Sequence, residues 1–389
     1  MLAGKCRIEE LAVLGGPRLF DSPKPTSNLV RPDPAQFFQY AGEVPATGHV
    51  LVPQLEARLA ALHGVRHCVA MCSGFWALAL AIDALRLDGR SEVVLPSLTY
   101  RRMADIVAWL GLVPHFCDIE LRTLANGAST VSPCVNEKTA LIVGVHPVGG
   151  HCDIDGLLAV ATAAGVPLIF DSVESVHERH RGRRIGGFGD AELFSLGASK
   201  LVNGFEGGYV TTDNAGFAGR LRRMRTGVID RPGGYAMSAE MIEIHAAMAL
   251  AGLDDLEAQV ARNRLRFDAY KRQLANLTGL RLVEADPASE PSHKNIVVEV
   301  LDGWPFTRDQ TVAILNAELI LARAYYAPPL THKPMAYAYI AGALPNTDFV
   351  ADRYISMPCG HLVTLDDIAN IASLLAFIGR HADAIRTRL

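Results

Sequence analysis

The residues whose types and spacing could do chemistry lie within residues 170–208. Asp171 ends an apolar run, Ser195 and Lys200 follow within thirty positions, and a glycine pair comes next. A pyridoxal phosphate (PLP) enzyme needs an anion for the pyridinium nitrogen, a hydroxyl donor for the phosphate and an amine for the aldehyde. The stretch therefore predicts PLP chemistry.

Asp171 and Lys200 are the two residues on which this chemistry would depend. Asp171 follows residues 166–170, a predicted buried strand, and ligands of open α/β folds bind at the carboxyl edge of such strands. The alternative for Asp171 is a helix N-cap. Lys200 has only uncharged neighbours, which favours a neutral amine that can form an imine. Taken alone, a lysine is more often a solvated surface charge.

Further ligand-binding candidates follow the ends of other predicted strands. Ser195 could donate to a phosphate, or be an ordinary strand-end hydroxyl. Ser73 and Gly74 stand where a strand turns into a helix, whose free N–H groups and dipole attract anions. Gly74 would allow close backbone approach, although an ordinary turn is the alternative. Tyr100 could stack on a cofactor ring or pack in the core.

Strand-length apolar runs alternate with helix-length stretches over the first 240 residues, which indicates a mostly parallel sheet with crossover helices. We expect the last two strands below to form an antiparallel pair. The predicted strands are residues 68–71, 92–95, 113–117, 140–145, 166–170, 193–196 and 208–212, and the predicted helices are 74–87, 104–112 and 154–164.

The pattern changes near residue 239. One long helix is predicted at about 239–276, followed by strands at 295–300, 319–326 and 354–357 and a final helix at 365–378. We therefore expect an α/β protein. Residues 1–255 would form a large PLP-binding domain with helices on both faces of its sheet, and residues 256–389 a smaller C-terminal α+β domain. Residues 20–52 would wrap the surface as an N-terminal segment.

Composition narrows the functional class. The 389 residues are half apolar and one-fifth charged, as in a folded globular protein, and the net charge is −4. No long basic block appears, which argues against nucleic acid as a partner. The apolar residues 68–85 could imitate a membrane span, but Asp83 interrupts them, so we expect a strand, a turn and a helix and no membrane partner.

The cysteines and histidines do not match a metal site. Seven scattered cysteines, an odd number, and a start without a signal-peptide core predict a cytoplasmic protein with reduced thiols. Cys68 and Cys72 have no second pair at zinc-finger spacing. His177 and His180 are one residue too close for the His-Glu-x-x-His zinc motif, so we expect no metal.

Assembled in this order, the residues resemble the PLP-dependent sugar aminotransferases of the DegT/StrS family, which have the fold-type I architecture of aspartate aminotransferase. The Gly-Gly-Phe-Gly-Asp-Ala-Glu-Leu-Phe-Ser run that ends at Ser195, followed by Lys200, is the strongest match. The resemblance covers nearly the whole chain and includes residues 11–17, 68–74, 95–100, 116–119, 144–146 with Gly149, 152–154, 186–208 and 354–371.

The resemblance implies a role for each position. Lys200 would carry the cofactor and move the proton, and Asp171 would pair with the pyridinium. Ser195 and the N–H groups after Gly74 would hold the phosphate of pyridoxal 5'-phosphate, and Tyr100 would cover one ring face. It also implies a homodimer with each active site at the interface, glutamate or glutamine as the amino donor, and an acceptor keto group on a nucleotide-linked sugar or a cyclitol, in aminosugar or antibiotic biosynthesis.

Several cofactor-binding positions depart from the family pattern. Glu174 replaces the usual Gln or His, and a negative charge there would alter the proton affinity of nearby groups. Phe75 and the tryptophan after it replace small residues in the turn. Ser238 and Glu240 stand where the partner subunit offers an Asn and a Lys or Arg. Fewer cations weaken the case for a diphosphate-bearing substrate, although the arginines after Tyr100 could offset the loss.

Three hypotheses follow. The first is an aminotransferase. The second keeps PLP but changes the reaction to decarboxylation, β-elimination or carbon–carbon bond formation on a non-nucleotide substrate, because the pyridinium stabilises any such carbanion. The third is a non-catalytic sensor that binds PLP or a metabolite, and the presence of Lys200 counts against it.

Overall fold

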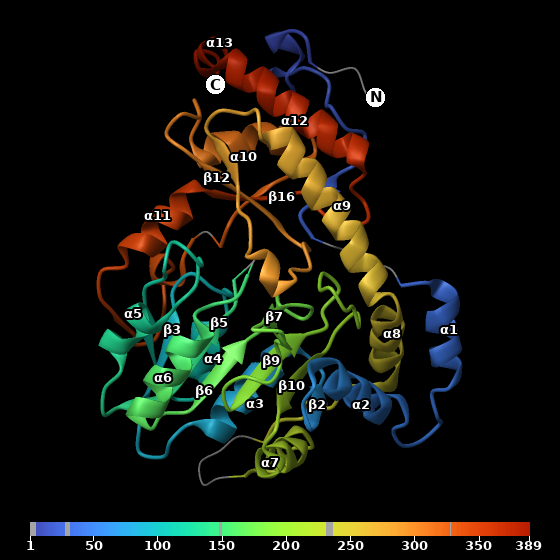
Figure 1. Cartoon of the computed structure of the whole chain (residues 1–389), viewed down its shortest axis with the longest axis vertical. Helices are drawn as coiled ribbons and strands as arrows, with labels where there is room; N and C mark the ends of the chain where they lie inside the picture. Colours follow the sequence, from blue (N-terminus) through green and yellow to red (C-terminus); the bar gives the residue numbers. More distant parts are fainter. Residues whose placement is uncertain (1–4, 28–31, 148–149, 231–235, 327) are drawn as a thin grey trace.

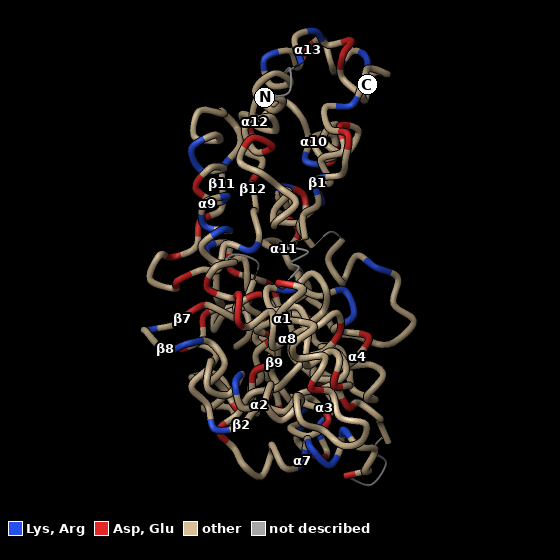
Figure 2. Tube along the Cα trace, turned by 90° about the vertical axis from the view of Figure 1, so that its right-hand side faces the viewer, with Lys and Arg blue, Asp and Glu red and all other residues tan. Residues whose placement is uncertain are grey.

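The computed structural model describes residues 5–27, 32–147, 150–230, 236–326 and 328–389. Gly149, one of the residues that carry the resemblance, lies outside these ranges. Figure 1 shows a large sheet-and-helix body with a smaller body above it. Acidic and basic residues are interspersed over both (Figure 2). Within the described ranges, no helix has both the length and the apolar character needed to cross a membrane.

The large body is built on one eight-stranded sheet. In the order given at the end of this paragraph, the first six strands are parallel to one another. The seventh strand, β10, is antiparallel to both β9 and β2. The predicted antiparallel pair is therefore confirmed. In sheet order the strands are β15 (Ile340–Ala341), β4 (Val113–Cys117), β3 (Glu92–Pro96), β5 (Thr139–Val145), β6 (Leu168–Asp171), β9 (Ala191–Ser195), β10 (Gly208–Thr212) and β2 (His67–Met71).

Helices cover both faces of this sheet because both faces of its strands are apolar. In β2, Val69 and Met71 enter one core cluster with α3 (Gly74–Leu85), α4 (Met103–Trp109) and α7 (Ala215–Arg225). Cys68 and Ala70 enter the other cluster with α2 (Leu51–His63), α6 (Ile154–Ala164) and α8 (Glu243–Asp254). The fold class predicted from the sequence is confirmed. The remaining helices here are α1 (Pro34–Gly42) and α5 (Ala128–Val131).

The smaller body is the α+β unit expected from the C-terminal sequence. Its four strands form an antiparallel sheet in the order β11 (Leu280–Leu282), β12 (Ile296–Val300), β16 (Tyr354–Met357) and β14 (Arg323–Ala324). Its helices are α9 (Leu256–Leu274), α10 (Arg308–Ala317), α11 (Pro345–Arg353), α12 (Leu365–Arg380) and α13 (Ala382–Arg386). Short elements elsewhere are the β7 (Arg179–His180) and β8 (Arg183–Arg184) pair and 3₁₀ turns at Ile8–Glu10, Ala12–Leu14, Ser132–Cys134, Pro287–Ser289 and Leu330–His332.

The single long helix expected at about 239–276 is wrong, because the structure has two helices, α8 and α9, that meet at Asp255. Asp255 leaves the helical conformation, with φ −94° and ψ 1°, and its carboxylate accepts a hydrogen bond from Arg262 at 2.5 Å. Aspartate is a poor residue for a helix interior because its side chain competes for local hydrogen bonds. We propose the domain boundary at this break.

Segments from both ends of the chain cross that boundary. Leu11, Leu19 and Phe20 pack in the core of the C-terminal body. β1 (Lys24–Pro25) pairs in parallel with β13 (Ile320–Leu321). In the other direction, β15 joins the edge of the large sheet. These exchanges hold the two bodies against each other and fix the elements that face the site between them.

Candidate active site

The predicted site residues meet at the carboxyl edge of the large sheet. Strands β2, β3, β5, β6 and β9 all end there, so the residues that follow them share one cavity of about 620 Å³. Its lining includes eight of the nine residues that we assigned to catalysis or cofactor binding, which are Ser73, Gly74, Phe75, Tyr100, Asp171, Glu174, Ser195 and Lys200.

The N-terminus of α3 forms an anion cradle at one end of the cavity. Ser73 caps the helix, with its Oγ accepting a hydrogen bond from Trp76 N at 3.3 Å. A Cβ on Gly74 would lie 2.9 Å from Ser195 Cβ, and one on Gly208 would lie 2.5 Å from Gly74 N. The two glycines therefore let β9, β10 and the helix start approach closely. The result is a space that backbone N–H groups and the Ser195 hydroxyl can share with a phosphate.

Phe75 and Tyr100 add aromatic surface to the cavity. Phe75 lies edge-on to the indole of Trp76, with ring centroids 5.2 Å apart, so the two large residues of this turn pack against each other. Tyr100 is 40% exposed, as a residue at the cavity mouth would be, and Arg101 lines the cavity beside it. The backbone of the cradle thus tolerates the unusual Phe-Trp pair.

Asp171 is a buried carboxylate at the end of β6. Its Oδ1 accepts a hydrogen bond from Val173 N at 3.2 Å. Burial raises the pKa of Asp171 to about 6, and the Lys200 ammonium offsets only part of that effect. A cationic ring nitrogen placed against this carboxylate would therefore be stabilised, and it would in turn stabilise the ionised acid.

Lys200 reaches the same cavity from the turn after β9. Its Nζ donates to Glu174 Oε1 at 2.7 Å. Burial acts to lower the pKa of Lys200, but the charge and hydrogen bond of Glu174, together with the nearby Asp171 and Tyr100, outweigh burial and raise the pKa. The structure thus places an amine next to Asp171 and the cradle, as the sequence spacing predicts.

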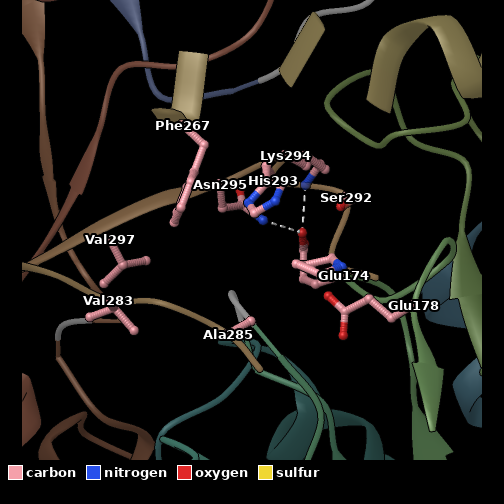
Figure 3. A pocket seen from close by; sticks show the side chains of 11 residues that line it. Glu174, Glu178, Phe267, Val283, Ala285, Ser292, His293, Lys294, Asn295 and Val297 are labelled. Carbon is pink, nitrogen blue, oxygen red and sulfur yellow. Dashed lines mark hydrogen bonds and ion pairs between the residues drawn. The ribbon is translucent and has the colours of Figure 1, made fainter. Parts of the chain in front are cut away.

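Glu174 has a further partner that sequence reasoning missed. Its Oε2 accepts from Lys294 Nζ at 2.5 Å and from Asn295 Nδ2 at 2.9 Å, as Figure 3 shows. Burial alone would raise the pKa of Glu174, but the two lysines outweigh burial and hold it well below its usual range. Lys294 lies more than ninety positions after Lys200, and no local motif marks it.

Other cavity residues also went unassigned, and they include Thr99, Val145, His146, Glu206 and Tyr326. The backbone of Tyr326 is in the left-handed region, with φ +43°, which is strained for a residue with a side chain. Such strain is found at functional sites, where the surrounding structure holds it in place. Proximity to the ends of β3 and β5 could have signalled the first three of these residues.

Ser238 is the ninth predicted residue, and the structure does not bring it into the cavity of its own chain. It is exposed and forms an isolated antiparallel bridge with Thr226. Glu240 is near the surface, 4.0 Å from His49 Nε2. Both positions are therefore on the outside of the protomer.

The fold and this cavity define a class: a fold-type I enzyme whose cofactor is PLP. The donor set suits that cofactor, because a buried carboxylate, an amine and a glycine-lined anion cradle surround one space.

Comparison with known proteins identifies the family. The model of the DegT/DnrJ/EryC1/StrS aminotransferase family matches residues 45–376. The chain is 31% identical to GDP-perosamine synthase of Caulobacter vibrioides over 324 residues, which is 82% of this chain and 84% of that protein. The chain therefore belongs to the DegT/DnrJ/EryC1/StrS aminotransferase family, and it is a PLP-dependent aminotransferase.

Solved structures agree with this assignment. The crystal structure of DesI in the presence of its TDP-sugar product is similar with a TM-score of 0.91 and 34% identity, over 98% of this chain and 99% of DesI. The Streptococcus pneumoniae protein Spr1654 in its PLP form matches with a TM-score of 0.80 over 92% of this chain and 99% of that one. At 19% identity, the second likeness supports the fold alone.

Proposed function

We propose that this aminotransferase moves an amino group from glutamate or glutamine to a keto group on a nucleotide-linked sugar, in aminosugar biosynthesis. The observation that carries the proposal is the meeting of Lys200, Asp171 and the Gly74–Ser195 cradle in one cavity. When bound, PLP supplies an aldehyde that exchanges amino groups and a cationic ring that withdraws electrons from the reacting carbon.

Lys200 has two tasks in this proposal. Its Nζ would hold the cofactor covalently, and the free amine would accept and return a proton at the reacting carbon. Both tasks need an amine that stays in place when released. The 2.7 Å contact with Glu174 Oε1 supports this, because it holds the free amine at the cavity wall.

Asp171 holds the ring in its cationic form. In water a pyridine nitrogen loses its proton easily, but a buried carboxylate beside it favours the protonated state. The raised pKa of Asp171, about 6, arises from burial, so a cationic partner lowers the free energy of the site. Tyr100, which lines the cavity at its mouth, would supply an aromatic surface for one face of the ring.

The cradle at α3 holds the phosphate. N–H groups of the first turn and the Ser195 hydroxyl are the donors, and the helix dipole adds a favourable field. Glycine at positions 74 and 208 leaves space that a phosphate group would need. Arg101 lies at the same cavity and is the cation we assign to an anionic part of the substrate.

The sugar-nucleotide acceptor is proposed from the relatives. GDP-perosamine synthase and the DesI structure with a TDP-sugar both concern nucleotide-linked sugars, and the chain matches each over most of its length. The departures at Ser238 and Glu240 remove a cation from the segment that would reach a partner's site. We therefore propose that Arg101 carries more of the diphosphate recognition here than a partner-derived residue does.

We also propose a cytoplasmic homodimer with the active sites at its interface. Phe38 is 69% exposed, and Val50, Ile242 and Ile244 are exposed as well. Phe205 joins this apolar surface through an edge-on contact between its ring and that of Phe37. A large exposed apolar surface is typical of a subunit interface. Sedimentation velocity tests the dimer, and a monomer at micromolar concentration would contradict it.

Absorbance spectroscopy tests the proposed chemistry. The purified protein with added PLP is expected to show a cofactor band that glutamate converts to the pyridoxamine form, and Lys200→Ala is expected to lose both the band and the conversion. Screening keto-sugar nucleotides for regeneration of the first band then identifies the acceptor. A lysine-dependent band that ignores glutamate and glutamine would contradict the proposed donor and favour another PLP reaction.

A further inference from the structure

Glu174 is contacted by lysines from two different parts of the fold. Lys200 follows β9 of the large sheet, whereas Lys294 precedes β12 of the C-terminal sheet. Their ammonium groups lie 2.7 Å from Oε1 and 2.5 Å from Oε2 of the same carboxylate. Figure 3 shows Lys294 and Asn295 meeting the carboxylate from one side. The ion pair therefore connects the C-terminal body directly to the active-site lysine.

The Lys294 side chain is only 6% exposed and that of Glu174 only 10%. A buried ammonium is unfavourable unless an anion pairs with it, so Lys294 depends on Glu174. Burial lowers the pKa of Lys294, and the charge of Lys200 lowers it further against the opposing pull of Glu174. Two cations thus share one carboxylate, and each weakens the hold of that carboxylate on the other.

We propose that Lys294 is a positioning residue that shares the charge of Glu174 and so limits how firmly this carboxylate holds the Lys200 ammonium. The proposal rests on the proposed role of Lys200. An amine that accepts a proton and returns it works best when neither protonation state is strongly favoured. Glu174 alone would hold the proton on Lys200, and Lys294 offsets that effect from the other oxygen.

Other titratable groups face this cluster from the surrounding elements. Asp171 and Tyr100 face Lys200, Cys359 faces Lys294, and Glu178 and Tyr326 face Glu174. Burial raises the pKa of Glu178 to about 8 and that of Cys359 to about 12, so both are mainly neutral at pH 7. These groups are unchanged in the variants below and form a common background.

The test measures the free amine of Lys200 in the cofactor-free protein by trace acetylation with acetic anhydride. Mass spectrometry compares the acetylation rate of Lys200 near pH 7 with that of exposed Lys138 in the same chain. Only the neutral amine reacts, so a shift of one pKa unit changes the rate about tenfold. Lys138 precedes β5 at the opposite edge of the sheet, roughly 20 Å from the site.

The two partners are expected to act in opposite directions. Lys294→Met removes a repelling cation and leaves the whole Glu174 charge to Lys200, so acetylation slows by about tenfold. Glu174→Gln removes the attracting anion, so acetylation speeds up by about tenfold or more. Lys294→Arg keeps the charge and stays near the wild-type rate. Lys138→Met, a lysine loss of equal size at the far edge, leaves the Lys200 rate unchanged when exposed Lys271 replaces Lys138 as the reference in that variant.

A merely structural role for Lys294 would give a different result. It would change the thermal midpoint while leaving the Lys200 rate unaltered, or faster through greater exposure, and either result would overturn the proposal. Lys294→Gln replaces the methionine variant if that variant does not fold. The measurement uses neither PLP nor an amino donor. A cofactor band that glutamate does not change would therefore contradict the proposed function without affecting this test.

Discussion

Replacing Gly74 with alanine perturbs the proposed phosphate cradle at its narrowest point. The added Cβ would lie 2.9 Å from Ser195 Cβ and 3.1 Å from Ser195 Oγ. Ser195 ends β9, which is paired on both sides, so its backbone cannot retreat. The Ser195 side chain must therefore rotate or move, and its hydroxyl leaves the place where it would donate to the phosphate.

The expected loss of affinity follows from one hydrogen bond. A hydrogen bond to a charged group contributes about 1.5–3 kcal/mol, so its loss corresponds to a PLP dissociation constant about 10- to 150-fold higher. The stability of the cofactor-free protein changes less. Overpacking costs about 1–3 kcal/mol, and replacing a helical glycine with alanine returns up to about 1 kcal/mol.

Absorbance titration of the cofactor-free protein with PLP measures the dissociation constant, and urea unfolding measures the stability. Gly219→Ala in α7 is the matched control, because its Cβ would have Arg223 Nη1 as its nearest neighbour, at 3.9 Å. That variant is expected to gain up to about 1 kcal/mol of stability and to bind PLP normally. Wild-type affinity in Gly74→Ala would refute the assignment of the cradle to the phosphate.

Two further predictions concern buried carboxyl groups whose pKa is raised. Because burial raises the pKa of Asp171 to about 6, its stabilising contribution is present at acidic pH and lost as the pH rises through about 6. Asp171→Asn should make the cofactor-free protein up to about 3 kcal/mol more stable to urea near pH 8 while weakening PLP binding; an unchanged stability would contradict the burial argument. The pKa of Glu178 is raised to about 8, and its Oε2 has no hydrogen-bond partner. Glu178→Gln should therefore flatten the fall in melting temperature between about pH 5 and pH 8, and a parallel fall in both proteins would refute this.

Much of the fold was predictable because its signals are local. The strands of the large sheet are runs of apolar residues buried on both faces, such as β5 and β6, and periodicity finds such runs directly. The break at Asp255 was missed because the apolar spacing continues through it. The crossing of β15 into the large sheet was missed because a two-residue strand has no periodicity to read.

The site was predictable to the extent that topology brings strand ends together. Asp171, Ser195 and Lys200 each follow a strand whose carboxyl end lies at the same edge, so order along the chain implied their proximity. Ser238 differs, because its predicted role belongs to a partner's site and one protomer holds it at its surface. That role stays a prediction.

Lys294 shows what a charge argument could have added. Glu174 stands in an apolar setting close to Asp171, and two buried carboxylates beside a single lysine leave an excess of negative charge. Buried charge of one sign requires compensation, so a second cation from elsewhere in the chain was to be expected. The sequence does not indicate which of the 37 basic residues supplies this second cation. Its identity depends on how the loop before β12 packs against the large sheet. A neutral residue at position 174 would need no such partner, so the glutamate at this position and the burial of Lys294 are best understood together. Glu174→Gln should therefore leave Lys294 as the uncompensated charge, and Glu174→Gln combined with Lys294→Met should recover part of the stability that the single Glu174→Gln variant loses.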